Sequence, residues 1–231
     1  EIKEAIGLQK PISVIYNYNG YGYGVFPIDP NNLDKTPEIK DEVARAYSYI
    51  NTYENTLTGK ITAVKAFDVF VKGIAVEQNE LIVKLLSNQL SSIFWDFLTI
   101  KQQVVAQAEL EQLLFNKLQT ELPSNIKKTI FGLFESIAYS KTGKEKLYQI
   151  WNKEIAIANL KLNEDDYINM AMDLAIYNHE RSDEIVRKTR AVISNLDKQK
   201  RFDFLFPSLS NDLGLRDAFM ESLKLQENRE K

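Results

Sequence analysis

The chain has 231 residues, enough for one large domain or two small ones with a sizeable buried core. Its hydrophobic fraction of 44% and charged fraction of 26% are typical of a globular protein and exclude an intrinsically disordered one. The 29 basic and 32 acidic residues nearly balance, so no global positive field favours nucleic acid or an acidic membrane as a partner. The sequence has no cysteine and a single histidine, which excludes disulfides, thiolate metal sites and cysteine nucleophiles.

The first thirty residues have the pattern of β structure. Aromatic and β-branched runs flank Asn19-Gly20, a dipeptide typical of hairpin turns because both residues tolerate positive φ. Pro27 has no backbone N–H and therefore ends the strand pairing. The sequence thus predicts a short β hairpin within residues 1–30, with a boundary to the next region near residues 29–37.

From that boundary onward, hydrophobic residues recur at helical spacing. Helix starts are predicted at Thr36-Pro37, Thr62, Asn79, Ser124, Asn163, Ser182 and Asp212, and interruptions at Gly59, Pro123, Gly143 and Pro207. These signals divide the region into roughly nine helices joined by short loops, without a tetratricopeptide or ankyrin period. The predicted fold is therefore mainly α, with stacked antiparallel helices over residues 31–231 behind the hairpin.

No catalytic constellation stands out in the sequence. Tyr21-Gly-Tyr-Gly is followed by extended chain rather than by a helix N-terminus, which favours a hairpin over a phosphate-binding loop. His179-Glu180 is half of a zinc motif, but position 183 holds Asp, and a catalytic zinc takes three protein ligands. We therefore expect His179 to be a solvated or dipole-facing histidine at a helix end. No metal or catalytic residue is predicted in this chain.

Two segments resemble the C-terminal region of the M1 family of zinc aminopeptidases, particularly its bacterial members. Residues 11–26, PISVIYNYNGYGYGVF, are similar to the strand pair that enters that domain. Residues 201–231, RFDFLFPSLSNDLGLRDAFMESLKLQENREK, are similar to the family's RF-x-F-x-x-P-x-LS-x-D-x-x-x-RD-x-F stretch and its NREKE-like tail. Between them the likeness is mostly of helical pattern, with residues 53–55 and 147–151 at fitting places.

The resemblance implies a non-catalytic domain of a larger peptidase. The family's zinc motif, H-E-x-x-H with a later Glu, and its Gly-x-Met-Glu-Asn motif do not occur in this sequence. Zinc is therefore implied for the parent enzyme alone, with no cofactor in this chain. The family's C-terminal domain is an α-α superhelix, a HEAT-like bowl that encloses the substrate cavity. The implied partners are the catalytic and β domains of the parent chain and a peptide substrate that loses its N-terminal residues.

Within that interpretation, Arg201 and Arg216 are the candidate substrate or interdomain contacts. Arginine suits bidentate capture of a peptide carboxylate or of an acidic group on a neighbouring domain. The structural alternative, which we weight more heavily, is that these arginines pair with Asp203, Asp212 or Asp217 and tie down the last helix.

Tyr16, Tyr18, Tyr21 and Tyr23 form the candidate interdomain hairpin, since an aromatic edge of this kind usually has a partner. The alternative function is a self-standing helical scaffold that binds a protein or peptide in its groove. No run approaches the roughly 20 apolar residues of a membrane helix, so no membrane partner is predicted. The compartment stays open between the bacterial cytoplasm and, if a leader was removed, the periplasm or cell envelope.

Overall fold

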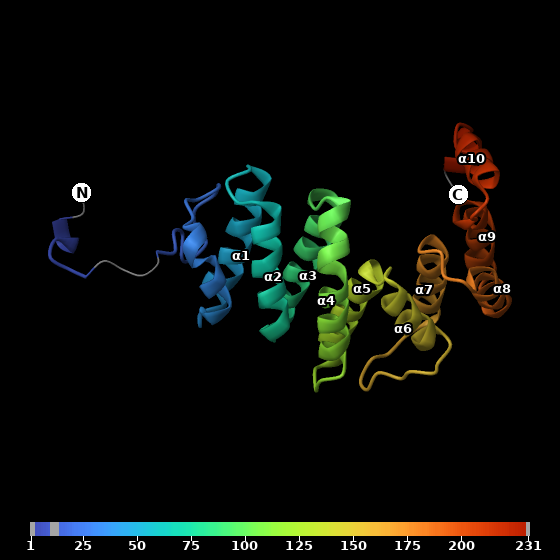
Figure 1. Ribbon diagram of the computed structural model, residues 1–231, viewed down its shortest axis with the longest axis horizontal. Coiled ribbons are helices and arrows are strands. Elements are labelled where there is room, and N and C mark those ends of the chain that lie inside the picture. Colours follow the sequence, from blue (N-terminus) through green and yellow to red (C-terminus); the bar gives the residue numbers. More distant parts are fainter. Residues whose placement is uncertain (1–2, 10–13, 230–231) are drawn as a thin grey trace. The chain divides into compact units, whose positions relative to one another are not determined.

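The computed structural model describes residues 3–9 and 14–229 of the chain, and helix dominates this part (Figure 1). The chain divides into two compact units, the first ending at Ala106 and the second beginning at Gln107, within helix α4. The mainly α fold class predicted from the sequence is confirmed. Among the described residues, no helix is both long enough and apolar enough to cross a membrane.

The predicted β hairpin is wrong for the described residues, which contain no strand; residues 11–13 lie outside them. A turn does form, but its backbone hydrogen bond joins Gly20 N–H to the Asn17 carbonyl (2.8 Å). Positive φ occurs at Asn17 and Gly20 rather than at Asn19 and Gly20. The Asn17 side chain bonds both backbone groups of Gly22, at 2.6 and 3.0 Å. An isolated hairpin is marginal in water, so local side-chain bonds prevail over strand pairing.

The first unit is a series of helices, of which the first precedes this segment and the others follow it. Its elements are η1 (Lys3–Ala5), η2 (Pro30–Glu38), α1 (Glu42–Leu57), α2 (Ala63–Val76), α3 (Glu80–Ser92), the π-helical turn η3 (Ile93–Phe97) and the start of α4 (Ile100–Leu118). The largest core side chains, Tyr49, Phe70 and Phe94, are fully buried. Gly73 of α2 allows Tyr49 of α1 to approach closely, because a Cβ there would lie 2.6 Å from the Tyr49 hydroxyl. The sequence therefore places its small residue where two helices meet.

One helix start in this unit was predicted wrongly. Thr36-Pro37 lies in the 3₁₀ helix η2, and α1 begins at Glu42 instead. The Asp41 carboxylate accepts a hydrogen bond from Ala44 N–H at 2.9 Å and so supplies the N-cap. Thr36 is buried at 4% exposure inside η2 and does not cap α1.

The second unit continues the helical pattern. It contains the rest of α4, α5 (Ser124–Ile137), α6 (Lys141–Trp151), α7 (Glu164–Ile176), α8 (Ser182–Val192), α9 (Leu196–Leu205), η4 (Phe206–Leu209), α10 (Leu213–Ser222) and α11 (Gln226–Arg229). Helix α7 packs against α5, α6 and α8. Gly143 does not interrupt the chain as predicted but lies inside α6, whose N-cap is Ser140. Its missing side chain makes room for the Glu111 carboxylate, which a Cβ would approach to 2.6 Å.

Several predicted caps are confirmed. The side chains of Thr62, Asn79 and Asp212 accept hydrogen bonds from the first turns of α2, α3 and α10. Asn163 and Asp166 form a reciprocal capping box at the start of α7. Helix boundaries were thus readable wherever a single polar side chain had no competing cap nearby.

Candidate functional site

The candidate site is the tyrosine segment, defined as residues 14–26, which is anchored to helix α1 at Phe26. The Phe26 N–H donates to Asn51 Oδ1 at 3.0 Å, and the Phe26 carbonyl accepts from the Asn51 and Asn55 amides at 3.2 and 3.0 Å. Asn51 and Asn55 are buried, at 6% and 0% exposure, one turn apart on α1. The Phe26 ring meets Tyr47 edge-on at 6.0 Å. Two buried side-chain amides therefore hold both backbone groups of one residue, Phe26, which fixes where the segment meets the helix.

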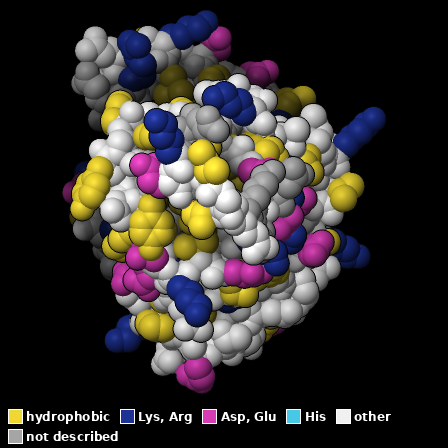
Figure 2. All heavy atoms as spheres, turned by 90° about the vertical axis from the view of Figure 1, so that its left-hand side faces the viewer, with side chains coloured by type: hydrophobic (Ala, Val, Ile, Leu, Met, Phe, Trp, Pro, Cys, Tyr) yellow, Lys and Arg dark blue, Asp and Glu magenta, His cyan; other side chains and the backbone are white. Residues whose placement is uncertain are grey.

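All four predicted tyrosines lie on the surface. Tyr16 and Tyr18 are about half exposed, whereas Tyr21 and Tyr23 are 91% and 106% exposed. Gly22 between them lies against the Phe26 ring, where a Cβ would come within 2.6 Å. Figure 2 shows one face of the molecule, on which hydrophobic side chains are scattered among acidic and basic ones. Tyr21 and Tyr23 thus offer two large aromatic side chains that cover nothing in the described part of the chain.

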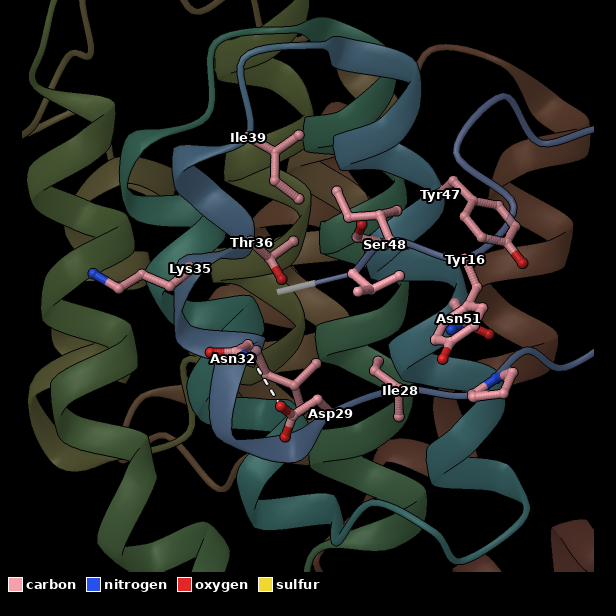
Figure 3. Close-up of a pocket in the computed structure, with 14 residues that line it drawn as sticks. Tyr16, Ile28, Asp29, Asn32, Lys35, Thr36, Ile39, Tyr47, Ser48 and Asn51 are labelled. Carbon is pink, nitrogen blue, oxygen red and sulfur yellow. Dashed lines mark hydrogen bonds between the residues drawn. The ribbon is translucent and has the colours of Figure 1, made fainter. Parts of the chain in front are cut away.

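A small cavity separates the tyrosine segment, η2 and α1 (Figure 3). Asn32 donates to Asp29 at its rim (2.8 Å), while Lys35 points away from it (Figure 3). Its volume of about 70 Å³ is room for about two water molecules, each with ~30 Å³ of liquid volume. It is therefore a gap in the packing of the anchored segment and too small for a peptide.

The two candidate arginines are both exposed, Arg201 on α9 and Arg216 on α10. Neither side chain pairs with Asp203, Asp212 or Asp217 within the described residues. Asp203 instead binds Arg190 through two hydrogen bonds of 2.5 and 2.8 Å. Neither guanidinium group has an ion-pair partner among the described residues, and the predicted role of the two arginines stays a prediction.

His179 differs from the solvated histidine that was one of the two expectations from the sequence. It is 6% exposed and stacks on Tyr148, with ring centroids 4.9 Å apart and planes 19° from parallel. Its Nδ1 accepts the Arg181 backbone N–H at 3.1 Å, so the proton of the neutral ring lies on Nε2. Burial lowers the pKa of His179 even though Glu145 and Glu180 are near. The described residues contain no group of three His, Asp or Glu side chains placed to hold a metal ion.

A cluster of half-buried carboxyl groups between α5 and α7 was missed from the sequence. Lys128 and Glu135 lie seven residues apart on α5, as do Asp166 and Asp173 on α7, and Lys128 pairs with Asp166. Burial, reinforced by Asp173, raises the pKa of Glu135 to about 8. Burial raises the pKa of Asp173 to about 7. The signal was available, because the seven-residue spacing puts each pair on one helix face.

No known family model matches the sequence, and a search of curated proteins gives no match either. The likeness to the M1 family thus rests on the motifs at the two ends of the chain. Any functional conclusion has to be argued from those motifs and from the geometry above.

Proposed function

We propose that this chain is a non-catalytic helical domain of an M1-type zinc aminopeptidase, which docks on the catalytic and β domains and helps to enclose the substrate cavity. The observation that carries the proposal is the tyrosine segment. Two buried amides, of Asn51 and Asn55, fix a segment whose Tyr21 and Tyr23 side chains are almost fully exposed among the described residues. Exposed, preoriented aromatic residues are typical anchors of an interface.

The zinc of such an enzyme does not fit the residues of this chain. The one histidine, His179, uses Nδ1 to accept a backbone N–H, and its Nε2 proton faces Glu145 Oε2 at 3.8 Å. A zinc ligand needs a free lone pair on one ring nitrogen. In this proposal the metal ligands and the catalytic carboxylate therefore belong to a domain outside this chain, where zinc would activate a water molecule for peptide hydrolysis.

The C-terminal helices supply a second surface for docking. Helix α10 has no buried residue, and Leu213, Met220 and Leu225 are exposed at 66%, 63% and 56%. Arg201 and Arg216 lie in the same part of the sequence without intramolecular partners among the described residues. Exposed apolar side chains beside two arginines that have no partner among the described residues support a role in contacts with another domain or with the peptide.

The isolated chain and the complete product of its gene distinguish this proposal from an intrinsic activity. We expect the 231-residue chain to bind no stoichiometric zinc and to hydrolyse no aminoacyl p-nitroanilide, and the complete product to do both. Zinc content by atomic emission and initial rates measure these properties. Stoichiometric zinc or aminopeptidase activity in the isolated chain would refute the proposal.

The docking role is tested by Tyr21→Ala with Tyr23→Ala in the complete product. Interface tyrosines are worth more than about 1 kcal/mol each, so we expect docking to weaken by about 2 kcal/mol. In calorimetry the helical domain then melts as a separate, earlier transition. Leu81→Ala, an exposed position on α3, is the control and leaves a single transition. Identical thermograms for the double variant and the control contradict the docking role.

The arginine role is tested separately with Arg201→Ala. Loss of a peptide-carboxylate contact raises KM and leaves kcat unchanged, because the contact is equally strong in the ground and transition states. Arg187→Ala on α8 serves as the matched exposed control. An unchanged KM with a lowered melting temperature would mean that Arg201 is purely structural.

A further inference from the structure

A recess of about 270 Å³ opens in the second unit, beside the turn that joins α7 to α8. Its lining is charged, aromatic and of mixed sign: Glu145, Tyr148, Glu154, His179, Glu180 and Arg181. All six residues belong to α6, to the segment just after it, or to the turn. The recess is therefore contained in one unit and is distinct from the docking surfaces proposed above.

The floor of the recess is rigidly built. His179 stacks on Tyr148, and the Arg181 guanidinium donates to the Tyr148 hydroxyl at 2.6 Å. The Arg181 backbone N–H holds His179 Nδ1 at 3.1 Å, which fixes both the tautomer and the ring orientation. One backbone and two side-chain interactions thus position these three residues before any ligand arrives.

One polar atom of this floor, His179 Nε2, faces a carboxylate oxygen but makes no hydrogen bond among the described residues. The His179 side chain is 5% exposed, and its Nε2 lies 3.8 Å from Glu145 Oε2, beyond hydrogen-bonding distance. Because Nδ1 is the acceptor, Nε2 carries a proton and can only donate. It has no lone pair for a metal ion, so the recess needs a ligand that presents an acceptor to Nε2–H.

The rim supplies preoriented groups of both signs. Gln149 donates to Glu145 Oε1 at 3.0 Å and Asn152 donates to Glu154 Oε1 at 2.6 Å, which leaves the second oxygen of each carboxylate available. Arg181 uses only Nη1 on Tyr148, which leaves its other N–H groups available. Three carboxylates thus surround one guanidinium, so the matching ligand carries one anionic group and an excess of positive charge.

We propose that this recess binds a basic α-amino acid of the arginine or lysine type. The ligand's carboxylate accepts from His179 Nε2–H and from the free N–H groups of Arg181. Its cationic groups lie against Glu145, Glu154 and Glu180. A volume of about 270 Å³ equals roughly nine waters at ~30 Å³ each, close to the ten or so non-hydrogen atoms of such a ligand. This inference is independent of the proposed docking role.

The single histidine makes the test direct, since the His179 ring protons are a unique NMR signal in this chain. We expect L-arginine, added at about pH 7.5 where the ring is neutral, to shift the His179 Cε1–H resonance saturably. A ligand of this size should bind with a dissociation constant of about 1 mM. Agmatine, which lacks the carboxylate, should bind at least about tenfold more weakly because a charged hydrogen bond is lost.

Matched variants assign the contacts. Arg181→Gln and Glu154→Gln should each weaken L-arginine binding at least about tenfold, while Arg187→Gln and Glu109→Gln, both exposed and outside the recess, leave it unchanged. If Arg181→Gln does not fold by circular dichroism, Glu154→Gln decides. The proposal is overturned by a linear response up to about 20 mM, some twenty times the expected constant. An equal shift with sodium chloride of the same ionic strength, or unchanged affinity in Glu154→Gln, overturns it as well.

Discussion

Two helix contacts each enclose ionisable side chains, and they differ in the partners that they provide. The carboxylate is paired with an arginine in the first contact and has no such partner, among the residues described, in the second. In the first unit, Arg45 of α1 donates hydrogen bonds of 2.7 and 3.1 Å to the carboxylate of Glu77, at the end of α2. Nη1 of Arg45 donates to the Ile39 carbonyl at 2.7 Å. Between α5 and α7 of the second unit, Glu135 Oε1 is buried without a hydrogen-bond partner in the described residues, and the Asp173 charge adds repulsion.

Hydrogen-bond donors decide whether burial raises the pKa of a carboxyl group in these two contacts. Burial by itself would raise the pKa of Glu77, but hydrogen bonds from Arg45, Gln78 and Asn79 lower it. Glu135 Oε1 has no such donor in the described part of the chain, and burial raises the pKa of Glu135 to about 8. The comparison teaches that burial sets how much free energy a charged carboxylate costs. The hydrogen-bond donors around it then decide whether the folded protein holds it charged or protonated. The first contact therefore keeps an ion pair, and the second holds a proton near neutral pH.

The largest effect is expected from breaking the paired contact with Arg45→Ala. Removing one partner of a buried ion pair leaves the other charge uncompensated and costs about 3–5 kcal/mol of unfolding free energy. Urea unfolding followed by circular dichroism measures this loss. Replacing both partners by apolar residues, Arg45→Met with Glu77→Met, should cost less than Arg45→Ala alone. A loss below about 1 kcal/mol in Arg45→Ala would show that the pair is not buried as described.

The unpaired contact should make stability depend on pH in the alkaline direction. Folding raises the pKa of Glu135 from 4.5 to about 8 and that of Asp173 from 3.8 to about 7. The resulting stability is fully present below the ordinary values and is lost as the pH rises through about 7 to 8. We expect a loss on the order of 2–4 kcal/mol between about pH 5 and pH 9.

Glu135→Gln tests the cause of that loss. The amide imitates the protonated acid, so the variant should match the parent near pH 5 and exceed its stability near pH 9. Glu109→Gln, an exposed substitution on α4, is the control and keeps the parental pH profile. A Glu135→Gln profile that is parallel to the parental one would contradict the buried-proton account.

A smaller effect is expected from Tyr49→Phe at the paired contact. The Tyr49 hydroxyl is fully buried against Gly73 without a hydrogen-bond partner in the described residues. Because an unsatisfied buried hydroxyl is unfavourable, its removal should stabilise the fold by about 1 kcal/mol. Thermal unfolding of the variant and the parent shows whether the substitution raises or lowers the melting temperature. A clear destabilisation would reveal a partner for the hydroxyl.

The smallest effect is expected at the surface, from Asp34→Asn. Hydrogen bonds from Lys65 and Lys72, both of 2.7 Å, lower the pKa of Asp34 from 3.8 to about 2. Its stabilisation is present above the ordinary pKa and is lost as the pH falls through about 2. The side chain is 39% exposed, so solvent screening limits the effect to about 0.5 kcal/mol. The melting temperature of Asp34→Asn should therefore change less between low and high salt than that of the parent.

The sequence predicted what local rules govern. Caps at Thr62, Asn79 and Asn163 were readable because each side chain bonds its own helix. The hairpin failed because Asn17, Asn51 and Asn55 bind the backbone groups that strand pairing would use. That competition involves residues up to 29 positions apart and has no local signal.

The seven-residue spacing of Lys128 and Glu135 was visible in the sequence, but the residues that surround His179 and Glu135 were not. The stack of His179 on Tyr148 and the facing of Glu135 toward Asp173 depend on how α6 and α5 pack against α7 and the turn after it. The tyrosines were identifiable because aromatic residues beside several glycines are unusual in a helical chain. Their exposure, however, follows from the anchor at Phe26.

The most direct test of the central claim is to read the coding sequence that precedes Glu1 in its gene. The account predicts an in-frame H-E-x-x-H motif with a later Glu, preceded by Gly-x-Met-Glu-Asn. A start codon a few residues before Glu1 would contradict it and favour the self-standing scaffold that binds a protein or peptide. A long upstream region without the zinc motif would also contradict an active parent aminopeptidase.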